Sequence, residues 1–244
     1  MSQVADSGAA KPKPDAESAL RLLAKQRSHM LVALTNPKSN SQACYVEWYR
    51  DTVGASADRA PGVLCSQLYE QHDVDVSVGR YPRLPYRYLA LYELSVDGAE
   101  AAAGALECIA NLHRLSNVSE APALWLYYAI SERVGRSAAV TPSTLTLAFA
   151  NAIPGREPEF REWYSTRHIR HALKVSGLVS GQCFERTQFQ WHQGPAPAFT
   201  TIAIYEQEGT PEAMIKSFAT LPAGALAFPA MDLSRFAEWV YRPV

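Results

Sequence analysis

The sequence predicts an α+β protein in which two tandem ferredoxin-like β-α-β-β-α-β repeats form an intramolecular α+β barrel. First, strand-length apolar runs and amphipathic helical segments follow this order twice along the 244 residues. Second, identical residues recur 115 positions apart, and such a fixed offset indicates an internal duplication. Third, a single unit leaves one apolar sheet face bare, so two units can bury these faces against each other. The recurring pairs are Asn36 and Asn151, Trp48 and Trp163, Tyr49 and Tyr164, Gly62 and Gly177, and Gln67 and Gln182.

The first repeat is expected within residues 28–135, after an N-terminal extension over 1–27 that is disordered or helical. Its apolar runs of strand length are bounded by turn residues such as Asn36-Pro37 and Pro61-Gly62. A helix before the second strand is expected to stop at Gly54, and an alanine-rich segment predicts the second helix. The expected strands are 29–36, 63–71, 86–94 and 123–130, and the expected helices are 44–53 and 97–113.

The second repeat is expected within residues 143–244 and shows the same order of elements. Its first helix begins after the tight turn at Ile153-Pro154-Gly155 and has a strong apolar periodicity. The expected strands are 144–152, 178–189, 200–207 and 236–241, and the expected helices are 157–175 and 211–220.

Composition limits the classes of partner. A formal net charge of −1 argues against nucleic acid, because nucleic-acid-binding proteins have a clear excess of Lys and Arg. No apolar run is long enough to span a membrane, and the N-terminus lacks a hydrophobic signal region, which predicts a cytoplasmic protein. The four cysteines lie far apart and are expected to be buried free thiols, with no metal site. A small-molecule substrate is the expected partner, and the sequence leaves open whether the protein forms a homodimer.

The helix predicted over 157–175 has a stripe of inward-facing polar residues. At 100° per residue, Phe160, Tyr164, His168 and His171 fall within a sector of about 80°. A histidine with an ordinary pKa near 6.5 is the natural acid/base at neutral pH, and a tyrosine one turn earlier can orient it. The stripe therefore predicts His168 and Tyr164 as catalytic residues, with Phe160 and His171 beside the substrate.

Each of these residues also has a structural explanation. An inward-facing histidine can be a hydrogen-bonded core residue, and His171 near the helix end can interact with the helix dipole. Asn151, Gln182 and Tyr205 are further candidate substrate contacts in the second repeat. Asn151 also fits a turn, Gln182 a hydrogen bond inside the barrel and Tyr205 a core aromatic.

These residues together resemble the dimeric α/β-barrel superfamily, in particular its EthD-like and cofactor-independent cyclase- or isomerase-like members. The resemblance is carried by Asn151, Phe160, Trp163, Tyr164, His168, Gly177 and Tyr205-Glu206. The first repeat has Val53 where the histidine belongs, which predicts that its site is degenerate.

The resemblance implies proton-transfer chemistry without a cofactor, in a pocket between the helices and the sheet of one repeat. The expected function is therefore a cofactor-independent acid/base enzyme, an isomerase, dehydratase, cyclase or related lyase, acting on a small apolar oxygenated or aromatic molecule. One alternative is a non-catalytic small-molecule binding or assembly protein of the same fold. A haem-binding barrel protein is a second alternative, with His168 or His113 as axial ligand.

Overall fold

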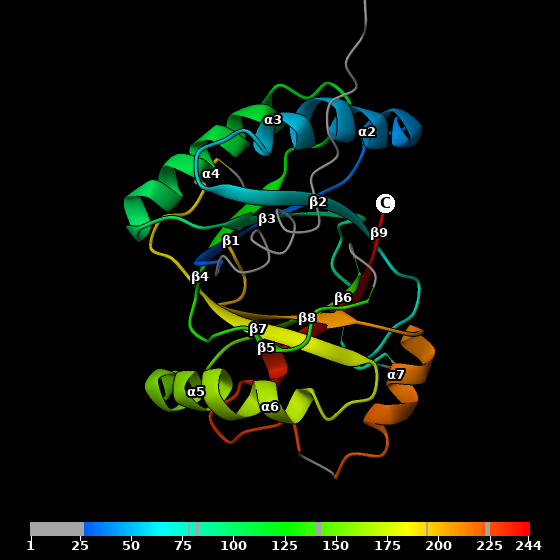
Figure 1. Cartoon of the computed structure of the whole chain (residues 1–244), viewed down its shortest axis with the longest axis vertical. Helices are drawn as coiled ribbons and strands as arrows, with labels where there is room; N and C mark the ends of the chain where they lie inside the picture. The colour runs from blue at the N-terminus through cyan, green and yellow to red at the C-terminus, as the bar shows by residue number, and fades with distance from the viewer. Residues whose placement is uncertain (1–26, 78, 82, 140–142, 194, 223–224) are drawn as a thin grey trace, which may run out of the picture.

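The apolar runs of the sequence form antiparallel strands, and helices cover their outer faces (Figure 1). The computed structural model describes residues 27–244 except 78, 82, 140–142, 194 and 223–224. The N-terminal extension expected over 1–27 lies outside this range except for Arg27. Strand β1 (His29–Thr35) is buried along its entire length because one face meets helices and the other the barrel interior.

The first half of the chain follows the order strand, helix, strand, strand, helix, strand. After β1 these elements are α2 (Gln42–Trp48), a π-helical turn η1 (Tyr49–Gly54), α3 (Ala55–Ala57), β2 (Val63–Gln71), β3 (Tyr88–Leu94), α4 (Gly98–Arg114) and β4 (Ala123–Ala129). The expectation that the first helix stops at Gly54 is wrong. Gly54 keeps helical backbone angles, and the helix continues to Ala57 through η1.

The second half repeats this order after a short strand, β5 (Val134–Gly135). Its elements are β6 (Thr144–Ala150), α5 (Glu157–Trp163), a π-helical turn η2 (Tyr164–His168), α6 (Ile169–Ala172), β7 (Leu178–Arg186), β8 (Thr201–Gln207), α7 (Pro211–Phe218), a 3-10 turn η3 (Leu233–Arg235) and β9 (Ala237–Pro243). Gly62 and Gly177 end the turns that lead into β2 and β7, with φ of 81° and 99°, a conformation that glycine adopts without strain.

The strands close into an eight-stranded antiparallel barrel, which confirms the predicted α+β class. The strand order is β4-β1-β3-β2-β9-β6-β8-β7, and β7 pairs back onto β4. The short strand β5 pairs with Ser180 and Gly181 on the same edge of β7 and so prolongs β4. The two halves therefore meet at two seams, β2 against β9 and β4 against β7.

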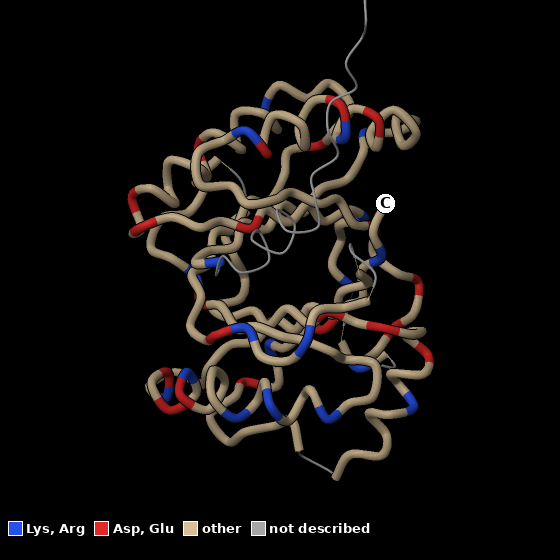
Figure 2. Tube along the Cα trace, viewed as in Figure 1, with Lys and Arg blue, Asp and Glu red and all other residues tan. Residues whose placement is uncertain are grey.

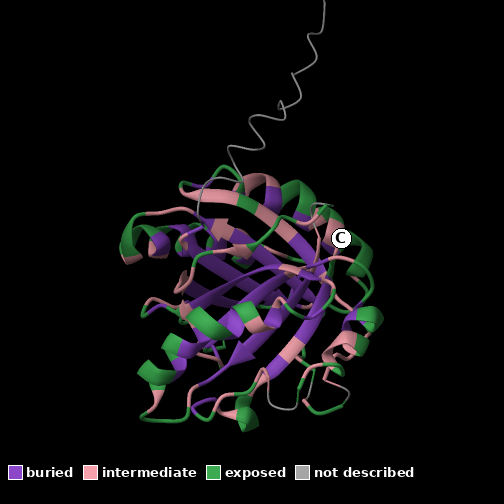
Figure 3. Ribbon diagram, turned by 60° about the horizontal axis from the view of Figure 1, so that its bottom comes forward, coloured by how far each residue is buried: buried purple, intermediate pink, exposed green. Residues whose placement is uncertain are grey.

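Three hydrophobic clusters fill the molecule. One lies inside the barrel and takes residues from both halves, such as Val32, Trp125, Leu147 and Trp239. The other two lie between each half of the barrel wall and its own helices. Buried residues accordingly concentrate on the strands, whereas the outward helix faces are exposed and have interspersed charges of both signs (Figures 2 and 3). Within the described residues, no helix has the length and apolar character needed to cross a membrane.

Candidate functional site

The predicted catalytic residues lie at the two ends of a π-helical turn. The helix begins at Glu157, with Pro158 in its first turn, and changes from α to π geometry at Tyr164. The π turn ends at His168, where α6 resumes the α-helical pattern. Short π-helical turns are rare and occur frequently at functional sites, because they re-aim the side chains that follow.

Four of the predicted site residues form one layer between this helix and the sheet. The Tyr164 ring stacks on Phe160, with 5.0 Å between the ring centroids. It also stacks on His168, with 4.7 Å between the centroids and an interplanar angle of 11°. The centroid of the His168 ring also lies 4.8 Å from that of Trp163 and, in an edge-on arrangement, 6.5 Å from that of Tyr205. We call Phe160, Trp163, Tyr164, His168 and Tyr205 the aromatic layer. All five side chains are buried.

One polar atom of the aromatic layer has a hydrogen-bond partner, whereas two others have none among the described residues. The Tyr164 hydroxyl donates a hydrogen bond to the backbone oxygen of Ala148 at 3.1 Å. His168 Nδ1 and the Tyr205 hydroxyl are buried and have no hydrogen-bond partner among the described residues. Each unsatisfied buried group costs about 1–3 kcal/mol. A ligand that bonds to them would recover that cost.

Burial decides the protonation states in the layer. Burial, with a smaller contribution from the charge of the neighbouring His171, lowers the pKa of His168 to about 3. Burial also raises the pKa of Tyr164 and of Tyr205 well above 10. His168 is therefore a neutral imidazole near pH 7, and the expectation of a histidine that titrates near neutrality is wrong.

A carboxylate that the sequence analysis missed faces the same layer. On β9, Trp239 points into the barrel and Val240 towards the helices, so the alternation of the strand puts Glu238 on the helix side. Part of Glu238 stays accessible, yet its buried surroundings raise the pKa of the carboxyl to about 7. A lone charged residue within the apolar run Ala237–Tyr241 is the signal that could have identified it.

The structure places Asn151, Gln182 and His171 outside the aromatic layer. The Asn151 amide donates to the backbone oxygens of Ala198 and Arg235, both at 3.3 Å, and its Oδ1 accepts from Thr200 N at 2.9 Å. Asn151 thus holds together the starts of β8 and β9. His171 is half-buried on α6, two turns beyond Tyr164.

Gln182 lies on the barrel side of β7, as its structural alternative predicted. Its Oε1 accepts from Arg27 Nε at 2.6 Å, and its Nε2 donates to the backbone oxygen of Ser131 at 3.0 Å. Arg27 also pairs with Glu93 at 2.7 Å. This network links the first half to the second through Arg27 inside the barrel.

The first half contains a corresponding layer with a histidine from another helix. Tyr92 and His113 Nε2 share a hydrogen bond of 2.7 Å, and the His113 ring lies 6.0 Å from Trp48 and 6.5 Å from Tyr49. His113 comes from α4, whereas His168 comes from the π turn. Burial lowers the pKa of His113 to about 4. The position that corresponds to His168 is the buried Val53, as the sequence indicates.

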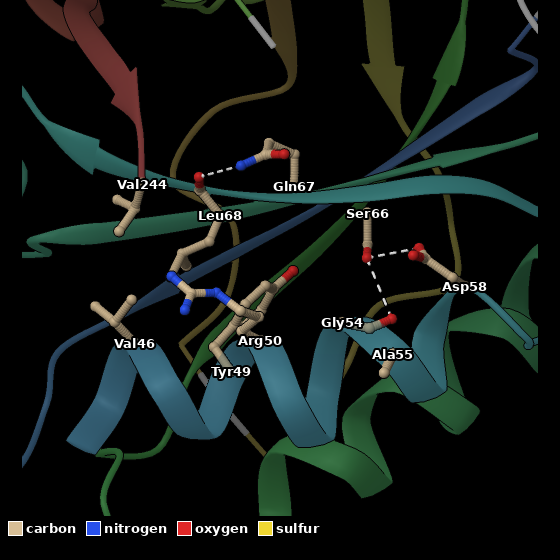
Figure 4. Close-up of a pocket in the computed structure, with 10 residues that line it drawn as sticks. All are labelled: Val46, Tyr49, Arg50, Gly54, Ala55, Asp58, Ser66, Gln67, Leu68 and Val244. Atoms are coloured by element: carbon tan, nitrogen blue, oxygen red, sulfur yellow. Dashed lines mark hydrogen bonds between the residues drawn. The ribbon is translucent and has the colours of Figure 1, made fainter. Parts of the chain in front are cut away.

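A cavity of about 370 Å³ opens in the first half, between the helix α2–η1–α3 and strand β2 (Figure 4). Ser66 points into it from β2 and donates to Asp58 Oδ1 at 2.7 Å. The buried Tyr49 hydroxyl has no hydrogen-bond partner among the described residues, and Arg50 also lines the cavity. Open space therefore exists in the half for which the sequence predicts a degenerate site.

The donor groups of the described residues fit neither a metal cluster nor a haem. Across the described ranges, no group of three or more His, Cys, Asp or Glu residues could hold a metal ion. His113 borders a smaller cavity of about 280 Å³, but its Nε2 is bonded to Tyr92. His168 is enclosed by three aromatic rings, and no histidine lines the cavity of about 370 Å³. All four cysteines are free, as predicted, but only Cys183 is buried.

Solved structures share this fold over nearly the whole length of both chains. A proposed monooxygenase from Fusobacterium nucleatum has 9% identity and a TM-score of 0.58, over 89% of this chain and 93% of that one. An anthrone oxidase-like protein has 12% identity and a TM-score of 0.56, over 91% of this chain and 93% of that one. A mutant chlorite dismutase from Candidatus Nitrospira defluvii has 9% identity and a TM-score of 0.56, over 91% and 94%. No known protein family and no curated protein matches the sequence. At these identities the likeness shows a common fold.

Proposed function

We propose that the protein is a cofactor-independent acid/base enzyme whose site is the aromatic layer of the second half. The observation that carries the proposal is the pair of buried, unpartnered polar groups, His168 Nδ1 and the Tyr205 hydroxyl, on rings in edge contact at 6.5 Å. The π turn that positions His168 and the fold shared with proteins named as monooxygenases and oxidases support it. The two halves are proposed to be duplicated ferredoxin-like units, and the chain an EthD-like member of the dimeric α/β barrels.

The chemistry follows from the protonation states. A neutral imidazole and an un-ionised phenol can donate hydrogen bonds to an oxygen on which negative charge develops. For carbonyl compounds, isomerisation, dehydration, cyclisation and lyase reactions share one possible first step, the loss of a proton from the carbon next to the carbonyl group. Phe160 and Trp163 make the surroundings of His168 apolar and aromatic, which favours an aromatic substrate. The proposed substrate class is a small aromatic ketone with an acidic C–H bond.

Anthrone, the compound in the name of one structural relative, is a suitable probe of this class. Deuterium exchange at its CH₂ group in D₂O, followed by NMR without oxygen, measures proton transfer directly. We expect the wild type to accelerate this exchange and His168→Gln to reduce the enzymatic rate by about 100-fold. His113→Gln is the matched control, because it replaces the buried histidine of the corresponding layer. Equal rates in the two variants, at equal melting temperatures, would refute the role of His168.

A non-catalytic binding function is the second candidate, and the cavity of about 370 Å³ in the first half favours it. In that case anthrone raises the melting temperature without exchanging its protons. Tyr49→Phe, which removes the unpartnered hydroxyl at the cavity, would then weaken the thermal shift, whereas Tyr164→Phe would not. The reverse order of effects would place binding in the second half.

A further inference from the structure

Glu238 occupies a position at which the two halves of the barrel differ in chemistry. The backbone registers correspond: Ala33 pairs with Leu124 between β1 and β4, and Ala148 pairs with Glu238 between β6 and β9. Leu124 is 1% exposed and packs in the hydrophobic cluster under the first half's helices. The second half has a carboxylate at the matching position, beneath its own helices.

The carboxylate lies beside the residues of the proposed site. Glu238 is directly across from Ala148, whose backbone oxygen accepts the hydrogen bond from Tyr164. The alternation of β9 directs the Glu238 side chain to the face of the sheet on which Tyr164 and Tyr205 lie. Burial is the main cause of the raised pKa of both phenols, and the charge of Glu238 acts in the same direction. Carboxylate, phenols and imidazole thus face one layer from β9, β8 and the π turn.

Glu238 also differs from the other carboxylates of the barrel wall in having no cationic partner. Glu93 pairs with Arg27, Glu185 with Arg161 and Glu206 with Arg133. Within the described part of the chain, the Glu238 side chain has neither an ion pair nor a hydrogen bond. An ion pair would hold a carboxylate in its charged form, so a carboxylate without one is free to exchange protons.

We propose that Glu238 is the proton-transfer group of the site, a role that rests on the function proposed above. The Glu238 carboxylate takes a proton from the carbon next to the substrate carbonyl, so a C–H bond breaks and an O–H bond forms. The electron pair of the broken bond moves to the carbonyl oxygen and gives an enolate. The Tyr205 hydroxyl and the neutral His168 ring donate hydrogen bonds to that oxygen. The partly exposed Glu238 carboxyl then exchanges its proton with solvent and returns the solvent proton to the same carbon, which completes exchange. Return of a proton to another carbon of the enolate system completes isomerisation.

The protonation states of the layer agree with this role. Burial raises the pKa of Tyr164, Tyr205 and the Cys183 thiol above their ordinary values and lowers that of His168 to about 3, where the charge of His171 acts in the same direction. Glu238, with a pKa of about 7, is therefore the group among these that changes charge near neutral pH. A base of this pKa is well matched to neutral solution.

The test uses the anthrone exchange assay on the full chain between pH 5 and pH 9. For the wild type we expect the exchange rate to rise about tenfold from pH 6 to pH 8, as the carboxyl loses its proton. Glu238→Gln should lower the rate by about 100-fold and abolish this pH dependence. Glu238→Leu, which introduces the residue found in the first half, should be equally inactive yet at least as stable as the wild type. This second variant excludes unfolding as the cause.

The outcomes separate the two proposals. If the wild type shows no exchange at any pH, the proposed function is refuted, and the role of Glu238 falls with it. If His168→Gln is inactive while the exchange rate of Glu238→Gln stays within twofold of the wild type, the proposed site is supported and the role of Glu238 is refuted. Glu238→Gln should lose the exchange rate but keep the increase in melting temperature that anthrone causes. That result supports a role of Glu238 in proton transfer rather than in binding.

Discussion

His113 and His168 bring an imidazole into corresponding layers of the two halves, but from different helices. A comparison of the sequence with itself detects His168 because Val53 stands at the matching position. The sequence names His113 only as an alternative haem ligand, because its place in the first layer depends on how α4 packs against Tyr92. The same limit applies to Glu238, since the meaning of one carboxyl in an apolar strand depends on which face of β9 it occupies. Residue types were thus predictable, whereas their environments required the fold.

The two buried histidines should make the protein sensitive to acid. Their pKa values are lowered to about 4 and about 3, so below pH 6.5 the unfolded chain binds protons that the folded chain excludes. Their contribution to stability is complete above pH 6.5 and is lost as the pH falls, by about 2 kcal/mol for each histidine at pH 5. Glu238, with its pKa raised to about 7, acts in the opposite sense, because its contribution is lost as the pH rises from 4.5 to 7.

Urea denaturation at pH 7.5 and pH 5 measures this effect. We expect the double variant His113→Gln/His168→Gln to lose much less stability between these two pH values than the wild type does. The exposed His192 provides the control, since His192→Gln should leave the pH dependence unchanged. A double variant with the wild-type pH dependence would show that the folded histidines accept protons.

At the scale of elements, the predicted order of strands and helices agrees with the structure, and the errors lie at helix ends. Gly54 was expected to end the first helix because glycine disfavours helices, by about 1 kcal/mol relative to alanine. The helix continues because burial of Tyr49, Val53 and Ala57 outweighs that cost. The π turns were not predictable, since the periods of α and π helices differ too little over five or six residues.

Gly181 on β7 allows the sheet to come close to the aromatic layer. A Cβ atom at this position would lie 2.6 Å from Cδ1 of the Tyr205 ring. We therefore expect Gly181→Ala to displace Tyr205 and to destabilise the protein by about 1–3 kcal/mol, with loss of anthrone exchange. Gly104→Ala is the matched control, because a Cβ there meets nothing within 4 Å and α4 should gain about 0.5–1 kcal/mol. Urea denaturation measures both. A neutral Gly181→Ala would mean that the Tyr205 ring moves without cost.

At the scale of the molecule, the apolar alternation of the strands predicts the barrel, but the seams that close it depend on contacts between distant residues. At one seam, Gln190 after β7 accepts from Leu126 N at 3.1 Å and donates to Leu126 O at 2.7 Å. The adjacent Trp191 is 7% exposed and packs on the core of the first half. No local pattern in the sequence identifies such a docking partner.

Because the barrel interior is built from both halves, the predicted repeats should unfold as one cooperative unit. Trp239 on β9 shares its hydrophobic cluster with Val32 and Leu34 of β1. We expect Trp239→Ala to cost about 3–5 kcal/mol and to preserve a single unfolding transition in urea. Native-state hydrogen exchange should then accelerate by the same factor in β1 and in β6, since both strands open only with the whole barrel. Leu233→Ala, at an exposed position on η3, should change neither rate. Two separate transitions, or faster exchange confined to the second half, would show that the halves are independent folding units joined only at their seams.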